Sequence, residues 1–144
     1  MQIRVISDLH IGVHGSKSND FLFSDSEFAR YLRHTMKRCD FLVLNGDVFE
    51  LWERPIWQNQ RQRLESILNS WPQIARLLRE PSKKLILIAG NHDQALTKQN
   101  LLRHAKNEVT IHCPGGRTVY IAHGHVADAW CRPGTVASKA SERL

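Results

Sequence analysis

Four short apolar segments, each predicted to be a strand, are followed directly by side chains that can bind a metal ion. Helical patterns lie between most of them, and alternation of buried strands with helices is typical of an α/β layer fold. In such folds the carboxyl ends of the strands meet at one edge of the sheet, where ligands collect. The sequence therefore predicts one site built from four loops. Its residues are Asp8 and His10 after 3–6, Asp47 after 41–44, Asn91 and His92 after 85–88, and His123 and His125 after 118–122.

The helices are predicted from capping residues and apolar spacing. Ser24 and Glu27 match a capping box that opens a helix ending near Arg38. A longer helical pattern covers 61–80, and because proline lacks an N–H, Pro72 should divide it into two helices. The apolar face of the first helix is expected to contain Phe28, Tyr31, Leu32 and Met36.

The second half of the chain is expected to hold a short helix and a hairpin. The helix is predicted over 97–105, and the segments 109–112 and 118–122 flank a Pro-Gly-Gly turn that joins them as a hairpin. With 144 residues, the chain is expected to form a single domain, 1–144, and the tail 129–144 carries no clear strand signal.

Composition limits the partners and the compartment. Twenty Lys plus Arg against fourteen Asp plus Glu give a formal net charge of +6, which favours phosphate-bearing partners or simply a well-solvated surface. No apolar run approaches the roughly 20 residues of a membrane-spanning helix. The three cysteines show no CxxC spacing, and the polar N-terminus does not resemble a secretory signal. A reduced, cytoplasmic protein is therefore expected.

The residue types at the strand ends favour divalent cations. Carboxylates and imidazoles without thiolates suit Mn²⁺, Fe²⁺ or Zn²⁺. Asp8 and His10 lie two residues apart, so in an extended chain both would point to the same side. Asp47 has two oxygens and could bridge two ions. Two such ions can clamp a phosphoryl group and lower the pKa of a water.

In their order, the strand-end motifs resemble those of the calcineurin-like metallophosphoesterase family. The resemblance covers residues 1 to about 128, and GNHD is its most specific motif. It implies an α/β sandwich of two sheets and a hydrolase of phosphoester bonds. The motifs are DxH (Asp8, His10), GD (Gly46, Asp47), GNHD (Gly90, Asn91, His92, Asp93) and HGH (His123, Gly124, His125).

The resemblance also implies a ligand set for two divalent ions, with manganese preferred and iron, zinc, nickel and magnesium as alternatives. Asp8 and His10 would bind the first ion. Asp47 would bridge both ions, and Asn91 and His123 would bind the second.

Further residues are implied around the substrate. His92 would contact the substrate phosphate and stabilise the transition state or protonate the leaving oxygen, and Asp93 would orient its ring. Glu50 is expected to lie behind the ligands or to bind metal itself. Arg54, with neighbouring Arg61 and Arg63, could meet the substrate phosphate, although a solvated helix face is the simpler interpretation.

One family motif is missing from the sequence. Family members carry a later GHxH motif that gives one histidine to each ion, and no such motif follows His125 here. The chain is therefore expected to be a member shortened at its C-terminus. Three alternatives stay open: water fills the vacant positions, His125 substitutes as a ligand, or a second subunit completes the site and covers the exposed sheet edge.

The expected function is metal-dependent hydrolysis of a phosphomonoester or phosphodiester. A catalytically impaired metal-binding or regulatory module, and a nuclease or nucleotide pyrophosphatase, are kept as alternatives. The segment 44–52 resembles the UDP-2,3-diacylglucosamine diphosphatase branch, but the chain lacks the length for the helical lid of those enzymes. A phosphorylated small molecule or nucleotide is therefore preferred over lipid pyrophosphate, with nucleic acid and a homo-oligomeric partner left open. The tryptophans are expected to serve packing rather than a substrate groove: Trp52, Trp57, Trp71 and Trp130.

Overall fold

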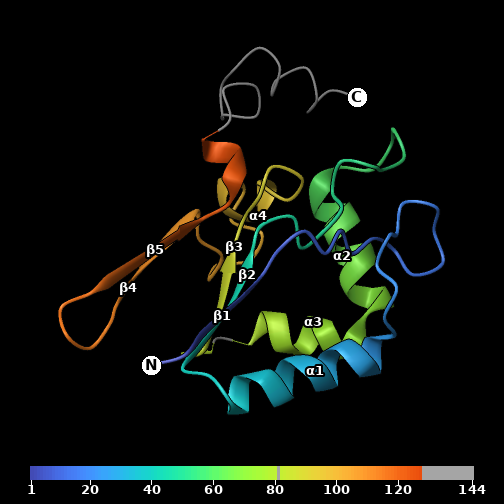
Figure 1. Ribbon diagram of the computed structural model, residues 1–144. Helices are drawn as coiled ribbons and strands as arrows, with labels where there is room; N and C mark the ends of the chain where they lie inside the picture. The colour runs from blue at the N-terminus through green and yellow to red at the C-terminus, as the bar shows by residue number, and fades with distance from the viewer. Residues whose placement is uncertain (81, 128–144) are drawn as a thin grey trace.

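A central parallel sheet separates a layer of helices from a two-stranded hairpin, as Figure 1 shows for the computed structural model. The structure describes residues 1–80 and 82–127, so Trp130 and the tail 129–144 lie outside the described residues. The layers confirm the predicted α/β architecture. Within the described ranges, no helix combines the length and the apolar character needed to cross a membrane.

The elements follow the predicted order closely. All five predicted strands form, including the two of the hairpin. The strands are β1 (Ile3–Ile6), β2 (Phe41–Asn45), β3 (Leu85–Ile88), β4 (Glu108–His112) and β5 (Thr118–Ala122). The helices are α1 (Asp25–Lys37), α2 (Gln60–Ser70), α3 (Pro72–Arg79), α4 (Ala95–Lys98) and a 3-10 turn, η1 (Gly124–Val126).

The three-stranded sheet has the order β1-β2-β3, and all its strands are parallel. Because β2 is central, both of its faces are covered. Leu42 and Leu44 belong to the core beneath the helices, and Val43 belongs to a second core beneath the hairpin. All three side chains are fully buried. The parallel arrangement directs the carboxyl ends of all three strands to the same edge.

The helical layer is fixed by caps as well as by apolar packing. Ser24 and Glu27 form the predicted capping box of α1. The Asp25 carboxylate in the first turn of α1 accepts the backbone N–H groups of Gln73 and Ile74 at 2.9 Å each. These N–H groups are among those that the start of α3 leaves without helical partners, so Asp25 ties the two helices together.

Pro72 divides the long helical segment as predicted. It occupies the first turn of α3, where its missing N–H costs no helical hydrogen bond. Trp71 lies at the junction between α2 and α3 and is almost completely buried. Its indole N–H donates to the Gly12 carbonyl at 2.7 Å, which anchors the loop after β1 against the helices.

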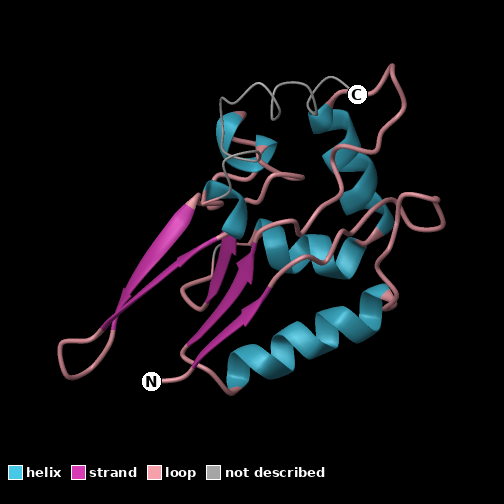
Figure 2. Ribbon diagram, turned by 45° about the horizontal axis from the view of Figure 1, so that its top comes forward, coloured by secondary structure: helices cyan, strands magenta, loops and turns pink. Residues whose placement is uncertain are grey.

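The hairpin of β4 and β5 covers the other face of the sheet (Figure 2). Ile111 and Ile121 pack there against Val43 and Ile88. The hairpin prediction is therefore confirmed, and the hairpin brings the end of β5 toward the ends of the parallel strands.

Two local predictions are wrong. The helix expected over 97–105 is the single turn of α4, because Asn100 adopts a left-handed conformation (φ 50°). The N–H groups of Asn100 and Leu101 return to the carbonyls of Thr97 and Leu96, and this Schellman arrangement ends the helix. Tyr31 is expected in the buried apolar face of α1, but its side chain is 45% exposed.

Candidate metal centre

The loop after β1 lies alongside the loop after β2. The Asp8 N–H donates to the Gly46 carbonyl at 3.1 Å, and the His10 N–H donates to the Asp47 carbonyl at 2.9 Å. As a result, one potential ligand atom from each of Asp8, His10 and Asp47 lies within 4.8 Å of the others. The structure therefore brings together three of the residues predicted to bind metal.

The backbone at these three positions is left-handed. The φ values are 56° at Asp8, 46° at His10 and 51° at Asp47. This corrects the expectation that Asp8 and His10 share one side of an extended chain: the turn at each residue, and not strand alternation, directs their side chains. Such conformations cost about 1–3 kcal/mol each in non-glycine residues and cluster at functional sites.

The Asp47 carboxylate is buried between three loops. Its Oδ1 accepts the His92 backbone N–H at 2.8 Å, and its Oδ2 lies 3.3 Å from His123 Nε2. Gly90 passes so close that a Cβ at this position would overlap the carboxylate and the Asp47 N–H. The loops after β2, β3 and β5 thus converge on one carboxylate, as the strand-end pattern predicted.

His123 presents its Nε2 atom to Asp47. His123 Nδ1 lies 2.9 Å from the Asn45 carbonyl oxygen, which can only accept, so Nδ1 carries a proton. In the neutral ring, Nε2 then has a lone pair directed at Asp47 Oδ2. Two electron pairs 3.3 Å apart require a cation between them, either a proton or a metal ion. Histidines that bind metal are commonly held in this way by a backbone carbonyl.

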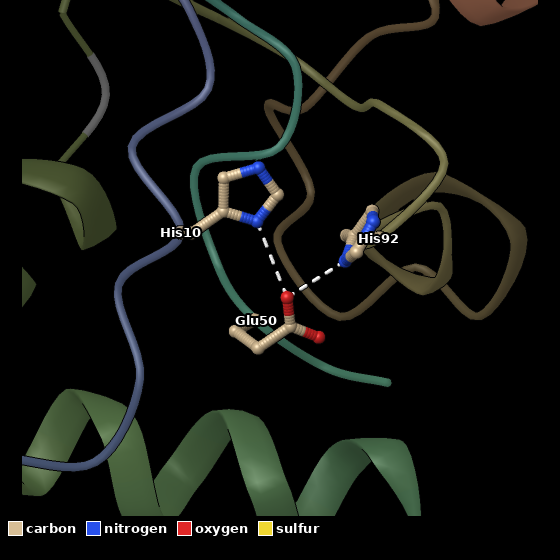
Figure 3. Close-up of side chains that lie close together, drawn as sticks. All are labelled: His10, Glu50 and His92. Carbon is tan, nitrogen blue, oxygen red and sulfur yellow. Dashed lines mark hydrogen bonds and ion pairs between the residues drawn. The ribbon is translucent and has the colours of Figure 1, made fainter. Parts of the chain in front are cut away.

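Glu50 joins two histidines of the site, as Figure 3 shows. Its Oε2 lies 3.2 Å from His10 Nδ1 and 2.7 Å from His92 Nδ1. Burial raises the pKa of Glu50, but hydrogen bonds from His92, Glu53 and His10 outweigh burial and lower the pKa to about 2. An ionised carboxylate only accepts, so both Nδ1 atoms carry protons and both Nε2 atoms are left for other partners.

His92 is held on two sides. Burial lowers its pKa, but the hydrogen bond and charge of Glu50 outweigh burial, with help from the charges of Asp47 and Asp93, and the net pKa is raised. The Trp52 ring stacks on the His92 ring at a centroid distance of 4.1 Å and an angle of 20°. Sequence reasoning did not assign this contact to Trp52. The spacing of Glu50 and Trp52 along one extended loop is the signal that could have suggested it.

The prediction that Asp93 orients the His92 ring is wrong. The hydrogen bonds of the Asp93 carboxylate go to the backbone N–H groups of Val48, Phe49 and Gly90, at 2.7 to 3.1 Å. Burial raises its pKa to about 6 against the effect of these donors. Asp93 therefore fixes the loops after β2 and β3 to each other, and Glu50 takes the role on His92 that was assigned to Asp93.

His125 is buried next to His123, with ring centroids 5.2 Å apart. Burial, together with the charge of His123, lowers the pKa of His125. Its Nδ1 has no hydrogen-bond partner among the described residues. A buried nitrogen without a partner is what a substitute ligand would provide, so that prediction stays open. Asn91 lies in the turn between Gly90 and His92, and its role as a ligand also stays a prediction.

The arginines near the site have structural partners. Arg54 donates to the carbonyls of Leu51, Trp52 and Gln58. These hydrogen bonds connect the two ends of the loop 51–58. Arg63 is buried and donates to the Glu50 carbonyl and to Ser18 Oγ, whereas Arg61 is exposed. These contacts do not support the expected role of Arg54 at a substrate phosphate, since its guanidinium already serves the loop.

The three tryptophans that the structure describes differ in their surroundings. Trp71 belongs to the core, Trp52 stacks on His92, and Trp57 is 86% exposed. Trp130 lies outside the described residues.

The residues fit divalent metal ions. They offer oxygen and imidazole nitrogen donors, the set that Mn²⁺, Fe²⁺ and Zn²⁺ accept. A cation between His123 Nε2 and Asp47 Oδ2, which lie 3.3 Å apart, would compensate the charge of the buried carboxylate. Glu50 with its two histidines is a further geometric candidate, but its oxygens are already occupied by four hydrogen bonds.

A family model described as calcineurin-like phosphoesterase matches residues 1–138 of the chain. A search of the curated proteins finds no match.

Replacing Gly90 by alanine should weaken metal binding, because the new Cβ would displace the Asp47 carboxylate. We expect the Mn²⁺ affinity of Gly90→Ala, measured by calorimetry, to fall at least about tenfold. Gly124→Ala is the matched control, since a Cβ there meets nothing within 4 Å. Equal affinities in the two variants would contradict this arrangement of the site.

Replacing Glu50 by glutamine should lower the pKa of His92, because the carboxylate charge that raises it is removed. NMR titration of the His92 ring protons measures this shift, with exposed Glu65→Gln as the control.

Because folding lowers the pKa of Glu50 from 4.5 to about 2, its contribution to stability is present above pH 4.5 and lost as the pH falls toward 2. The variant should therefore lose less stability than the wild type across that window. An unchanged His92 titration in Glu50→Gln would refute the assignment of Glu50 as the carboxylate that raises the pKa of His92.

Proposed function

The chain belongs to the calcineurin-like phosphoesterase family, and we propose that it hydrolyses a phosphomonoester or phosphodiester with two divalent metal ions. Membership supports hydrolase chemistry on phosphoesters in general. The observation that carries the proposal is the convergence of Asp8, His10, Asp47 and His123 at the carboxyl ends of the strands, with His123 Nε2 3.3 Å from the Asp47 carboxylate.

We assign the ligands by loop. Asp8 and His10 would hold one ion, Asn91 and His123 the other, and Asp47 would contact both, since each of its oxygens already faces a different loop. When bound, such ions supply Lewis acidity to the phosphoryl oxygens and lower the pKa of a water. Manganese is the proposed metal, with iron, zinc, nickel and magnesium as alternatives, and His125 is the candidate for a vacant ligand position.

His92 would act on the substrate. Its Nδ1–H is committed to Glu50, so the ring presents Nε2, and the raised pKa favours a proton on that atom. A protonated Nε2 can stabilise negative charge on the phosphoryl group and donate its proton to the leaving oxygen. Glu50 keeps the ring in this tautomer, and the stacked Trp52 limits its rotation.

The proposed substrate is a phosphorylated small molecule or a nucleotide. The formal net charge of +6 is compatible with such an anion. The resemblance of 44–52 to the UDP-2,3-diacylglucosamine diphosphatase branch has no second observation behind it, so lipid pyrophosphate is left out of the proposal.

Asp47→Asn should abolish hydrolysis, because a neutral amide removes the negative charge of the carboxylate that is proposed to contact both metal ions. We expect a loss of more than about 100-fold for chromogenic mono- and bis-esters with added Mn²⁺. Exposed Asp20→Asn is the matched control and should retain full activity. Hydrolysis that survives Asp47→Asn would refute the mechanism. Tight Mn²⁺ binding without hydrolysis of either ester would instead favour a metal-binding module.

A further inference from the structure

The loop 51–58, between β2 and α2, supports His92 in two ways. Glu50 divides its carboxylate: Oε2 faces His92 Nδ1 at 2.7 Å, and Oε1 accepts the backbone N–H groups of Trp52 and Glu53 at 2.9 and 3.1 Å. The indole of Trp52 also stacks on the His92 ring. Trp52 therefore acts on His92 directly through its side chain and indirectly through Glu50, so a shift of its backbone would move both supports together.

The stacked indole restricts a freedom that the hydrogen bond leaves open. The χ2 torsion of a histidine has broad minima, so one hydrogen bond at Nδ1 does not fix the plane of the ring. The Trp52 indole lies against one face of His92, with 4.1 Å between centroids, and the His10 ring lies perpendicular to His92 at 4.7 Å. These contacts set the direction in which Nε2 points.

Arg54 holds Trp52 in its place in the loop. Its Nη1 donates to the Leu51 and Trp52 carbonyls at 3.0 and 3.4 Å, and its Nε donates to the Gln58 carbonyl at 3.0 Å. The Gln58 side chain in turn donates to Ser66 Oγ in α2 at 2.9 Å. Because the loop itself forms neither helix nor strand, these hydrogen bonds connect Trp52 to a helix. The planar fork of a guanidinium suits this task, since it can donate to several carbonyls at once.

We propose that Arg54 is a positioning residue for His92, which it holds in place through Trp52. This inference rests on the proposed function, in which His92 Nε2 donates a proton to the leaving oxygen. In that step a water oxygen forms a new bond to phosphorus, and the bond to the leaving oxygen breaks with its electron pair on that oxygen. The proton from Nε2 then makes the leaving group a neutral hydroxyl compound. Such a transfer needs a donor within hydrogen-bond reach.

Esters with different leaving groups measure how well His92 is placed. A para-nitrophenolate is a weak base that leaves without a proton, whereas a phenolate is a stronger base that benefits from one. Arg54→Ala and Trp52→Ala should each lower kcat for phenyl phosphate at least about fivefold more than kcat for para-nitrophenyl phosphate. KM should change little for either ester, since neither residue is placed in contact with the substrate.

Three further variants sharpen this comparison. Trp57→Ala and Arg33→Ala are the matched controls, because Trp57 is 86% exposed in the same loop and Arg33 is exposed on α1. Both should keep the wild-type ratio of the two kcat values. Trp52→Phe should also keep it, since an aromatic ring still covers His92. In the double variant Arg54→Ala/Trp52→Ala the loss should be smaller than the product of the single losses, because both changes act through one loop.

NMR of the metal-free protein gives a measurement that is independent of activity. The ring current of the indole shields ring protons of His92 that lie over its face. The His92 ring resonances should therefore move downfield in Trp52→Ala and also in Arg54→Ala, although the second variant retains the indole. They should stay in place in Trp57→Ala and Arg33→Ala.

The outcomes distinguish this inference from the proposed function. If the wild type hydrolyses neither ester, or if His92→Ala loses both esters equally, the proposed role of His92 fails and this inference is overturned with it. If His92→Ala loses phenyl phosphate selectively but Arg54→Ala keeps the wild-type ratio or the wild-type His92 resonances, only this inference is overturned. A raised KM with unchanged kcat in Arg54→Ala would also overturn it, since Arg54 would then contact the substrate.

Discussion

The carboxylate of Asp47 is the group on which the organisation of the site depends. It is buried, it accepts the His92 N–H through one oxygen, and it faces His123 through the other. A buried carboxylate needs compensating donors or cations, because removing its charge from water costs several kcal/mol. Gly46 and Gly90 provide the space: a Cβ at Gly46 would overlap the His123 ring, and one at Gly90 would overlap Asp47.

Two other carboxylates define the surroundings of Asp47 in different ways. Asp93 is fully buried and holds backbone N–H groups, so it fixes the shape of the loops. Glu50 holds imidazoles, so it fixes which nitrogen of His10 and of His92 faces the site. The protein therefore uses one carboxylate for loop geometry and another for tautomers, and Asp8 and Asp47 are the carboxylates that we propose as metal ligands.

The strand ends, the capping box at Ser24 and the division at Pro72 could be predicted because each depends on local chemistry. The convergence of Asp8, His10 and Asp47 also followed from the rule for parallel strands. The exchange of roles between Asp93 and Glu50 could not be predicted, since Glu50 is 42 residues from His92 and meets it only in the folded chain. The left-handed turns at Asp8, His10 and Asp47 were also unexpected, because residues 8–10 were taken as extended, although aspartate and histidine are among the non-glycine residues that adopt positive φ most often.

The central claim is that side chains from separate loops hold divalent ions together. Diffraction from crystals soaked in Mn²⁺, recorded at the manganese absorption edge, tests this claim most directly. The account predicts an anomalous peak in contact with both Asp47 and His123, and a second in contact with Asp8 and His10. An absence of anomalous density at Asp47 in saturating Mn²⁺ would contradict it.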